Sequence, residues 1–106
     1  MGKRQGGVIL KNKHFVKLLS IIKNNNFSVM YLSKNGEEPF GSTKVKLKEN
    51  NKELLFENKD ESREFYVSFE NIISILKDGY RRYKILYSDG TYIHMMPRNN
   101  PLRTYK

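Results

Sequence analysis

The spacing of apolar residues near the start of the chain predicts a helix. Four of them recur at positions i, i+3, i+4 and i+7, which share one face of an α-helix: Phe15, Leu18, Leu19 and Ile22. Lysines occupy several of the remaining positions, and three asparagines at 24–26 supply a stop. We therefore expect a helix over residues 11–23, and no other segment has this period.

Short strands are predicted for the rest of the chain. Residues 44–48 alternate strictly, so that Val45 and Leu47 point inward and the lysines point outward. Apolar residues also alternate within 64–76, but their phase slips near residues 70–71, where a bulge or a bend between two strands would explain the change. Six strands are expected in all: 27–34, 44–48, 53–57, 64–76, 83–87 and 91–96.

Two turn signals indicate how neighbouring strands meet. The segment 35–42 begins with Asn-Gly but is too long for a tight hairpin, so we expect an extended connection there. The Asp-Gly pair at 89–90 fits a two-residue type I′ turn. That turn defines the residue pairs around it: Ser88 with Thr91 and Tyr87 with Tyr92.

These elements predict an α+β fold that is mainly β. An N-terminal helix is followed by about six short strands, and a sheet this small is expected to form a small, partly closed antiparallel barrel, because closure removes exposed edges. We place a single barrel-like domain at residues 8–97. Residues 1–7 are expected to form a flexible basic tail and residues 98–106 a basic C-terminal tail.

The order of elements over residues 11–75 resembles the Sm-like (Hfq-type) family of small RNA-binding barrels. The segment FSVMYLSKNG at 27–36 looks like that family's second strand with its Asn-Gly turn, and FYVSFENIISI at 65–75 looks like its closing strands. The resemblance implies a small barrel, an RNA ligand and a homo-oligomer. The Tyr-Lys-His with which bacterial members contact RNA would fall near residues 68–70, where Ser-Phe-Glu stands, so no RNA-contacting residue is carried over. A PUA-like pseudo-barrel, another small RNA-binding fold, resembles the same order, and the hairpin at 83–96 has no Sm-like counterpart.

The net charge points to an anionic partner. The 106 residues include 20 Lys and Arg against 11 Asp and Glu, a formal charge of +9. Residues 1–36 hold seven basic and no acidic residues, residues 37–76 six basic and nine acidic, and residues 77–106 seven basic and two acidic. Two cationic ends around an acidic middle indicate an asymmetric surface, which a Lys-rich composition from an AT-rich genome would not by itself produce.

The chain has no cysteine, which excludes disulfides, thiolate zinc sites and a cysteine nucleophile. The apolar run at residues 8–10 is too short for a signal-peptide core, and no run is long enough to span a membrane. We therefore expect a cytoplasmic protein without a membrane partner.

An inventory of reactive side chains predicts no enzyme, cofactor or metal. Neither His14 nor His94 has a His, Asp or Glu three or four residues further along the chain. One acidic cluster could hold a hard cation, but it lacks the alternating ligand pattern of a calcium loop: Glu57, Asp60, Glu61 and Glu64. We also find no glycine-rich phosphate loop, nucleophile elbow or nuclease-like carboxylate pattern.

The first candidate for a nucleic-acid site is a run of cations and phenols: Tyr80, Arg81, Arg82, Tyr83 and Lys84. Arginine binds a phosphate through two N–H groups, and Tyr or Arg planes stack on bases, so the mixture suits single strands or loops. The structural alternative is that Tyr83 points inward with Ile85 and Tyr87 as part of the core, which would leave only the cations outside.

Two further groups of cations complete the candidate site. Lys44, Lys46 and Lys48 lie along one strand face at roughly 6.5–7 Å intervals, close to the phosphate spacing of a nucleic-acid strand, or they protect a sheet edge from aggregation. The tails, with Arg98 in the second, either fold over a bound backbone or stay solvated.

The leading hypothesis is a small, non-enzymatic regulator that binds nucleic acid. RNA or another single strand is preferred, because the chain offers no second helix for a helix-turn-helix and no zinc site. The alternative is a protein of a phage or other mobile element that binds and inhibits or modulates a nucleic-acid-handling protein of its host. A structural subunit of a larger assembly is the third option.

Overall fold

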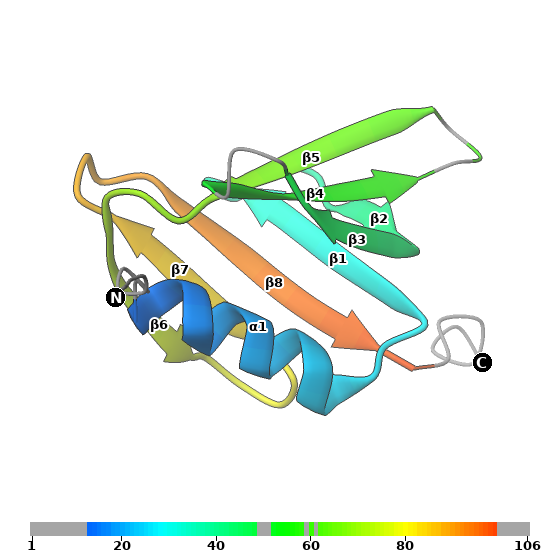
Figure 1. Ribbon diagram of the computed structural model, residues 1–106, viewed down its shortest axis with the longest axis horizontal. Coiled ribbons are helices and arrows are strands. Elements are labelled where there is room, and N and C mark those ends of the chain that lie inside the picture. Colours follow the sequence, from blue (N-terminus) through cyan, green and yellow to red (C-terminus); the bar gives the residue numbers. More distant parts are fainter. Residues whose placement is uncertain (1–12, 49–51, 59, 61, 100–106) are drawn as a thin grey trace, which may run out of the picture.

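The computed structural model describes residues 13–48, 52–58, 60 and 62–99, and within them it has one helix and eight strands (Figure 1). In chain order they are α1 (Lys13–Asn25), β1 (Val29–Lys34), β2 (Phe40–Ser42), β3 (Lys44–Leu47), β4 (Glu53–Asn58), β5 (Arg63–Ser68), β6 (Ile72–Lys77), β7 (Tyr83–Tyr87) and β8 (Tyr92–Arg98). The predicted tail at 1–7 and all of the second tail beyond Asn99 lie outside the described residues.

The strands form two antiparallel sheets, which confirms the prediction of a mainly β fold with an N-terminal helix. The first sheet has five strands in the order β2-β1-β8-β7-β6, and the second has three in the order β3-β4-β5. Every pair of neighbouring strands is antiparallel. Over the described residues the pairing gives two sheets and no closed barrel, so the barrel remains a prediction.

Two bends explain why eight strands stand where six were predicted. Only Thr43 separates β2 from β3, yet β2 belongs to the five-stranded sheet and β3 to the three-stranded one. Residues 69–71, with Asn71 at φ 65°, separate β5 from β6, and there the chain returns to the five-stranded sheet. The bend expected within 64–76 is confirmed. The prediction of a connection without a strand over 35–42 is wrong, because Phe40–Ser42 pairs with β1.

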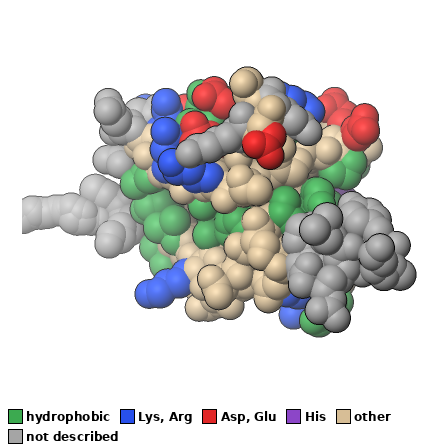
Figure 2. Space-filling view, turned by 90° about the vertical axis from the view of Figure 1, so that its right-hand side faces the viewer, with side chains coloured by type: hydrophobic (Ala, Val, Ile, Leu, Met, Phe, Trp, Pro, Cys, Tyr) green, Lys and Arg blue, Asp and Glu red, His purple; other side chains and the backbone are tan. Residues whose placement is uncertain are grey.

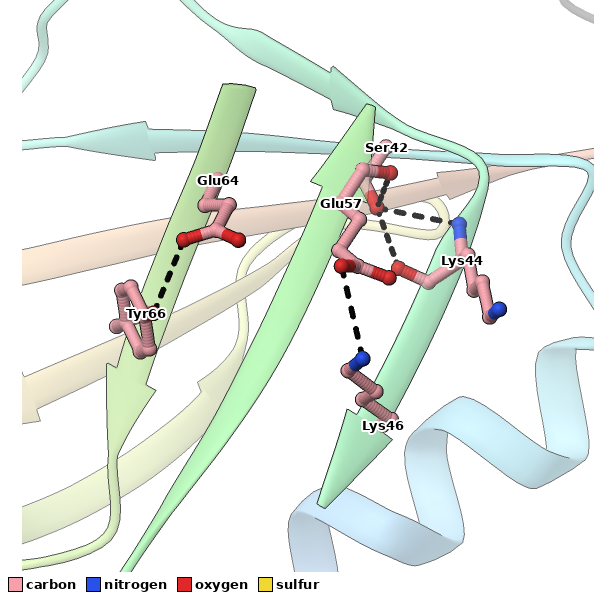
Figure 3. A network of polar contacts seen from close by, with 6 residues as sticks. All are labelled: Ser42, Lys44, Lys46, Glu57, Glu64 and Tyr66. Atoms are coloured by element: carbon pink, nitrogen blue, oxygen red, sulfur yellow. Dashed lines mark hydrogen bonds and ion pairs between the residues drawn. The ribbon is translucent and has the colours of Figure 1, made fainter. Parts of the chain in front are cut away.

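Ser42 holds the first bend in place. Its side chain is fully buried, and its Oγ lies 2.8 Å from the carbonyl oxygen of Lys44 and 2.9 Å from that of Glu57 (Figure 3). Nearby, Asn58 Nδ2 donates to the carbonyl oxygen of Gly41 at 2.9 Å. Both contacts tie β4 to the bend, so they fix the two sheets to each other at this corner.

The helix and the three-stranded sheet pack on the same face of the five-stranded sheet, which we call the inner face. The buried core combines residues from all three parts: Leu18 and Ile21 of α1, Leu54, Phe56 and Val67 of the three-stranded sheet, and Met30, Leu32, Ile85, Ile93 and Met95 of the five-stranded sheet. Lys17 Nζ also donates to the carbonyl oxygen of Ile75 on β6, at 3.0 Å. Figure 1 shows α1 lying across β6, β7 and β8.

The buried side of α1 differs from the predicted stripe. Ile21 is only 7% exposed, whereas Leu19 is 39% exposed, because the sheet meets the side of the helix that carries Leu18 and Ile21. The helix also runs past the predicted stop at residue 23 and ends at Asn25. Asn26 follows at φ 44°, the left-handed conformation that commonly terminates a helix.

The hairpin between β7 and β8 has a different turn from the predicted one. Leu86, not Tyr87, pairs with Tyr92, and the Tyr87 amide donates to the carbonyl oxygen of Thr91 at 3.0 Å, so residues 88–90 form a three-residue loop. Of these three residues only Gly90, at φ 93°, has a positive φ. A type I′ turn needs two such residues, whereas a three-residue loop needs one, at its last position. The predicted pairing was therefore wrong by one residue.

Candidate nucleic-acid interface

The predicted cations fall into two groups on different parts of the fold. One group consists of Lys44, Lys46 and Lys48, on and just after β3 in the three-stranded sheet. The other surrounds the β6–β7 connection, β7 and the end of β8: Tyr80, Arg81, Arg82, Lys84 and Arg98. The two groups are separated by the change of sheet at Thr43, so they have to be assessed independently.

Glutamates offset the charge of the β3 lysines. Lys44 pairs across the strands with Glu57, which in turn pairs with Glu64, and Lys46 Nζ lies 3.6 Å from Glu57 Oε2 (Figure 3). The backbone of Lys48 is bonded to that of Glu53, so a third glutamate lies on the neighbouring strand. Figure 2 shows Lys and Arg interspersed with Asp and Glu over the upper part of the molecule, where this sheet lies. The face has no clear excess of positive charge for phosphates.

Two arginines of the second group are held by hydrogen bonds where α1 and β8 end. Arg81 Nη2 donates to the carbonyl oxygen of Asn25 at 3.0 Å and to Asn99 Oδ1 at 2.9 Å. Arg98 Nη1 donates to the carbonyl oxygen of Arg81 at 2.9 Å. The guanidinium of Arg81 thus lies at the carboxyl end of α1, where the helix dipole favours a cation. These contacts bring the last turn of the helix, the β6–β7 connection and the end of β8 together.

One carboxylate, Asp78, lies among these cations. Its Oδ2 is 3.6 Å from Arg82 Nη2 and 3.2 Å from His94 Nε2. This group therefore has four cationic side chains and one carboxylate, in contrast to the three-against-three balance beside β3. The cations are Arg81, Arg82, Lys84 and Arg98. This end of the molecule keeps a positive charge that an anion can use.

Part of this group projects from the face of the five-stranded sheet opposite to the core, which we call the outer face. Ser33, His94 and Lys84 form one row across β1, β8 and β7. The residues two positions along each strand share the same side because side chains alternate. On β1, β7 and β8 the outer face consists of Val29, Tyr31, Ser33, Lys84, Leu86, Tyr92, His94, Met96 and Arg98.

The outer face is open along the described part of the chain. None of its side chains belongs to the buried core, and the helix and the three-stranded sheet pack on the inner face. Val29 and Ser33 are buried and its other side chains are partly exposed, whereas Ile85, Ile93 and Met95 on the inner face of the same strands are buried.

Two tyrosines give the outer face its aromatic surface. The Lys84 ammonium lies 4.6 Å from the ring centroid of Tyr92, and the His94 ring meets the Tyr92 ring edge-on at 5.4 Å. Tyr31 lies against Gly41 of β2, where a Cβ would come within 3.3 Å of the tyrosine ring, so glycine at this position lets the ring lie close to the sheet. The sequence analysis did not find Tyr31, Tyr92 or His94 as site residues.

The two tyrosines of the predicted basic run differ in position. Tyr83 is partly buried and packs against the core, which confirms the structural alternative given for it. Tyr80 is 85% exposed in the β6–β7 connection. Of the two phenols, only Tyr80 is therefore presented to solvent beside the arginines.

A separate pocket of about 240 Å³ lies at the other end of the five-stranded sheet, beside the β7–β8 loop. It is lined by the end of β1, by β5, by the bend at 69–71 and by the loop itself. Tyr87 closes one side and donates a hydrogen bond from its hydroxyl to the carbonyl oxygen of Ser68 at 2.8 Å. Burial, with a smaller effect of the Asp89 carboxylate, raises the pKa of Tyr87 to about 12, so this phenol is neutral at physiological pH.

Metal and membrane sites were also assessed in the described ranges. They contain no group of three or more His, Cys, Asp or Glu side chains placed to hold a metal ion; Glu61 of the acidic cluster lies outside those ranges. No helix in the same ranges has both the length and the apolar character needed to cross a bilayer.

No protein-family model, no curated protein and no solved structure matches this chain. The function therefore has to be inferred from the chemistry of the surfaces described above.

Proposed function

We propose that this protein binds single-stranded nucleic acid, with RNA preferred to DNA, on the outer face of the five-stranded sheet, and that it acts as a small non-enzymatic regulator. The observation that carries the proposal is the presence of Tyr31 and Tyr92 with Lys84 and Arg98 on one open sheet face. The β3 lysines are left out because glutamates offset their charge.

The residues of this face match the two requirements of single-strand binding. Aromatic rings stack on bases of any sequence, and cations beside them contact the phosphates. The Lys84 ammonium lies over the ring of Tyr92, 4.6 Å from its centroid, so a base that stacks on this face of the ring would displace the ammonium, which could then contact a phosphate beside the base. Arg98 extends the positive charge along β8, whereas Arg82 lies 3.6 Å from Asp78, which offsets its charge as Glu57 offsets that of Lys46.

The two rings are separate stacking positions. Tyr31 pairs with Met96, which lies four residues from Tyr92 along β8. At about 3.4 Å per residue the two tyrosines are roughly 14 Å apart along the strand. A single strand lying along β8 could therefore stack one base on each tyrosine, with Lys84 between the two bases and Arg98 beyond Tyr31.

We also propose that the two sheets form a partly closed barrel in solution. Its support is the continuity of the chain through both bends, at Thr43 and at 69–71. A barrel of this kind would keep the curved five-stranded sheet rigid and its outer face accessible. Uniform protection from hydrogen exchange across β2, β3, β5 and β6 would support it, and independent exchange of the two sheets would contradict it.

The test is a titration of labelled oligouridylate, followed by fluorescence anisotropy, at increasing salt. Three or four phosphate contacts give a slope of log K against log salt of about −2 to −3 for a single strand. A dissociation constant that stays constant from low to high salt contradicts the proposal. Retention of a protein partner after nuclease treatment would favour the alternative, binding to a nucleic-acid-handling protein.

A further inference from the structure

The pocket beside the β7–β8 loop combines hydrogen-bond acceptors, one cation and an aromatic ring. Asp89 of the loop and Glu70 of the bend contribute carboxylates, and Lys34 at the end of β1 contributes an ammonium group. Tyr66 of β5 lies at the same pocket and is 44% exposed, so its ring can stack on a ligand. The pocket of about 240 Å³ is smaller than the roughly 300–1,000 Å³ of a drug-sized site and suits a ligand of one ring system.

The charges of the pocket disfavour a phosphate. The lining residues include two carboxylates, those of Asp89 and Glu70, and one ammonium group, that of Lys34, and Glu70 Oε2 also lies 3.7 Å from Lys52 Nζ. A phosphate would meet the carboxylates as like charges. A neutral ligand that donates hydrogen bonds to carboxylates and accepts one from an ammonium group is compatible with every charged group of the pocket.

Asp89 is already oriented by the loop. Its Oδ1 accepts hydrogen bonds from the amide of Thr91 at 2.9 Å and from the hydroxyl of Thr91 at 2.6 Å. Those hydrogen bonds, together with the Lys34 charge, lower the pKa of Asp89, so the group is an ionised acceptor at neutral pH. Its second carboxylate oxygen, Oδ2, takes part in neither of these two hydrogen bonds and can accept from a ligand.

We propose that this pocket binds an unpaired guanine base of the same nucleic-acid strand that the outer face binds. The choice of a nucleobase rests on the proposed function. Guanine presents two adjacent donors, N1–H and the N2 amino group, which carboxylates accept, and its O6 and N7 accept from an ammonium group. Adenine, cytosine and uracil lack this pair of adjacent donors beside an acceptor.

The pocket and the outer face are connected by the hairpin that they share. Thr91 lines the pocket and the next residue, Tyr92, projects from the outer face. The amide of Tyr92 donates to Asn35 Oδ1 at 2.9 Å, which holds this part of the hairpin against the end of β1. A base stacked on Tyr92 and a neighbouring base in the pocket would therefore bind on the two sides of the same short turn.

The test is a titration with nucleosides, which carry no phosphate and so report on the pocket alone. Guanosine, inosine, adenosine and cytidine are added to the full chain, and backbone amide shifts are followed by NMR. Guanosine is expected to shift the amides of Asn71, Ser88 and Thr91. Inosine, which lacks the N2 amino group, is expected to bind at least about tenfold more weakly, because a hydrogen bond to a charged group is lost.

Two variants identify the acceptors. Asp89→Asn keeps a residue type that favours turns but removes the carboxylate, and it should weaken guanosine binding by about tenfold or more. Glu70→Gln removes the other carboxylate, on the exposed bend, and should also weaken guanosine binding. It is the variant to use if Asp89→Asn does not fold. Lys84→Ala is the control: it should leave guanosine binding unchanged while weakening the binding of oligouridylate, which contains no guanine.

The outcomes separate this proposal from the proposed function. Equal affinity for the four nucleosides, or shifts confined to the outer face, would overturn the guanine pocket. Binding of oligouridylate without binding of guanosine overturns the pocket and leaves the proposed function standing. Failure of both ligands overturns both.

Discussion

Leu86 lies opposite Tyr92 in the β7–β8 pair, so Tyr92 projects from the outer face of the sheet and not from the face of Tyr87, which packs against the core. A shift of one residue in a hairpin moves every side chain of the strand to the other face. The three-residue loop at 88–90 therefore determines that Tyr92 and His94 are available to a ligand.

Replacing the outer tyrosine should weaken RNA binding. Tyr92→Ala removes a stacking surface worth about 1–3 kcal/mol per base, so the dissociation constant for oligouridylate should rise by about 5- to 150-fold. Tyr66→Ala, on the other sheet, is the matched control and should leave this guanine-free ligand unaffected. Anisotropy titrations measure the dissociation constant of both variants. An equal loss of affinity for oligouridylate in the two variants would contradict binding on the outer face.

Two lysines in different surroundings should differ in their effect on salt dependence. Lys84→Ala removes a cation of the outer face and should reduce the slope of log K against log salt by about 0.7. Lys46→Ala removes the same charge from the face where Glu57 lies 3.6 Å away, and should leave the slope unchanged. If Lys46→Ala reduces the slope as much as Lys84→Ala does, the ligand does not bind the outer face in preference to the β3 face.

The buried hydroxyl at the first bend should contribute to stability. Ser42→Ala removes the contacts of Oγ with Lys44 and Glu57 inside the fold, and should lower the free energy of unfolding by about 1–3 kcal/mol. Thr43→Ala, one residue away and exposed, should change it by less than about 0.5 kcal/mol. Urea denaturation measures both, and equal stability of the two variants would show that the bend does not depend on Ser42.

Stability should fall at high pH because of Tyr87. Burial raises its pKa from 10.0 to about 12, so the folded state keeps a proton that the unfolded state has lost. The stabilising contribution is complete below pH 10 and disappears between about pH 10 and pH 12. Denaturation midpoints across this range should decline less steeply for Tyr87→Phe, which has no ionisable group, and the same decline in both proteins would assign the effect to other residues.

The sequence predicted features that depend on local pattern. The helix, the inward position of Val45 and the bend near residues 70–71 all produce a visible period or a break in one. The alternation predicted over 44–48 was wrong for Leu47, which is 44% exposed. Strand β2 was missed because Phe40–Ser42 is too short to show a period and follows Pro39. The predicted apolar stripe of the helix included Leu19 and left out Ile21, because either residue has a spacing that fits one helical face.

The candidate site was predicted only in part, because most of it depends on pairing between distant strands. That glutamates of β4 and β5 lie beside the lysines of β3 follows from strand register, which composition does not reveal. Tyr31 and Tyr92 looked like ordinary strand residues until β1 and β8 were found to be neighbours. One Gly90 with a positive φ, in place of two such residues in the turn, was enough to reverse the expected face.

The first and last described strands are hydrogen-bonded neighbours, with Met30 opposite Pro97. All other neighbouring strands are connected through short stretches of chain, so they can associate early and at little entropic cost. The β1–β8 ladder must instead wait until the chain has been synthesised through the end of β8, about seventy residues after β1 begins. Tyr31 and Tyr92 lie on opposite sides of that late-forming seam, so a nascent or C-terminally shortened chain would lack the complete binding face.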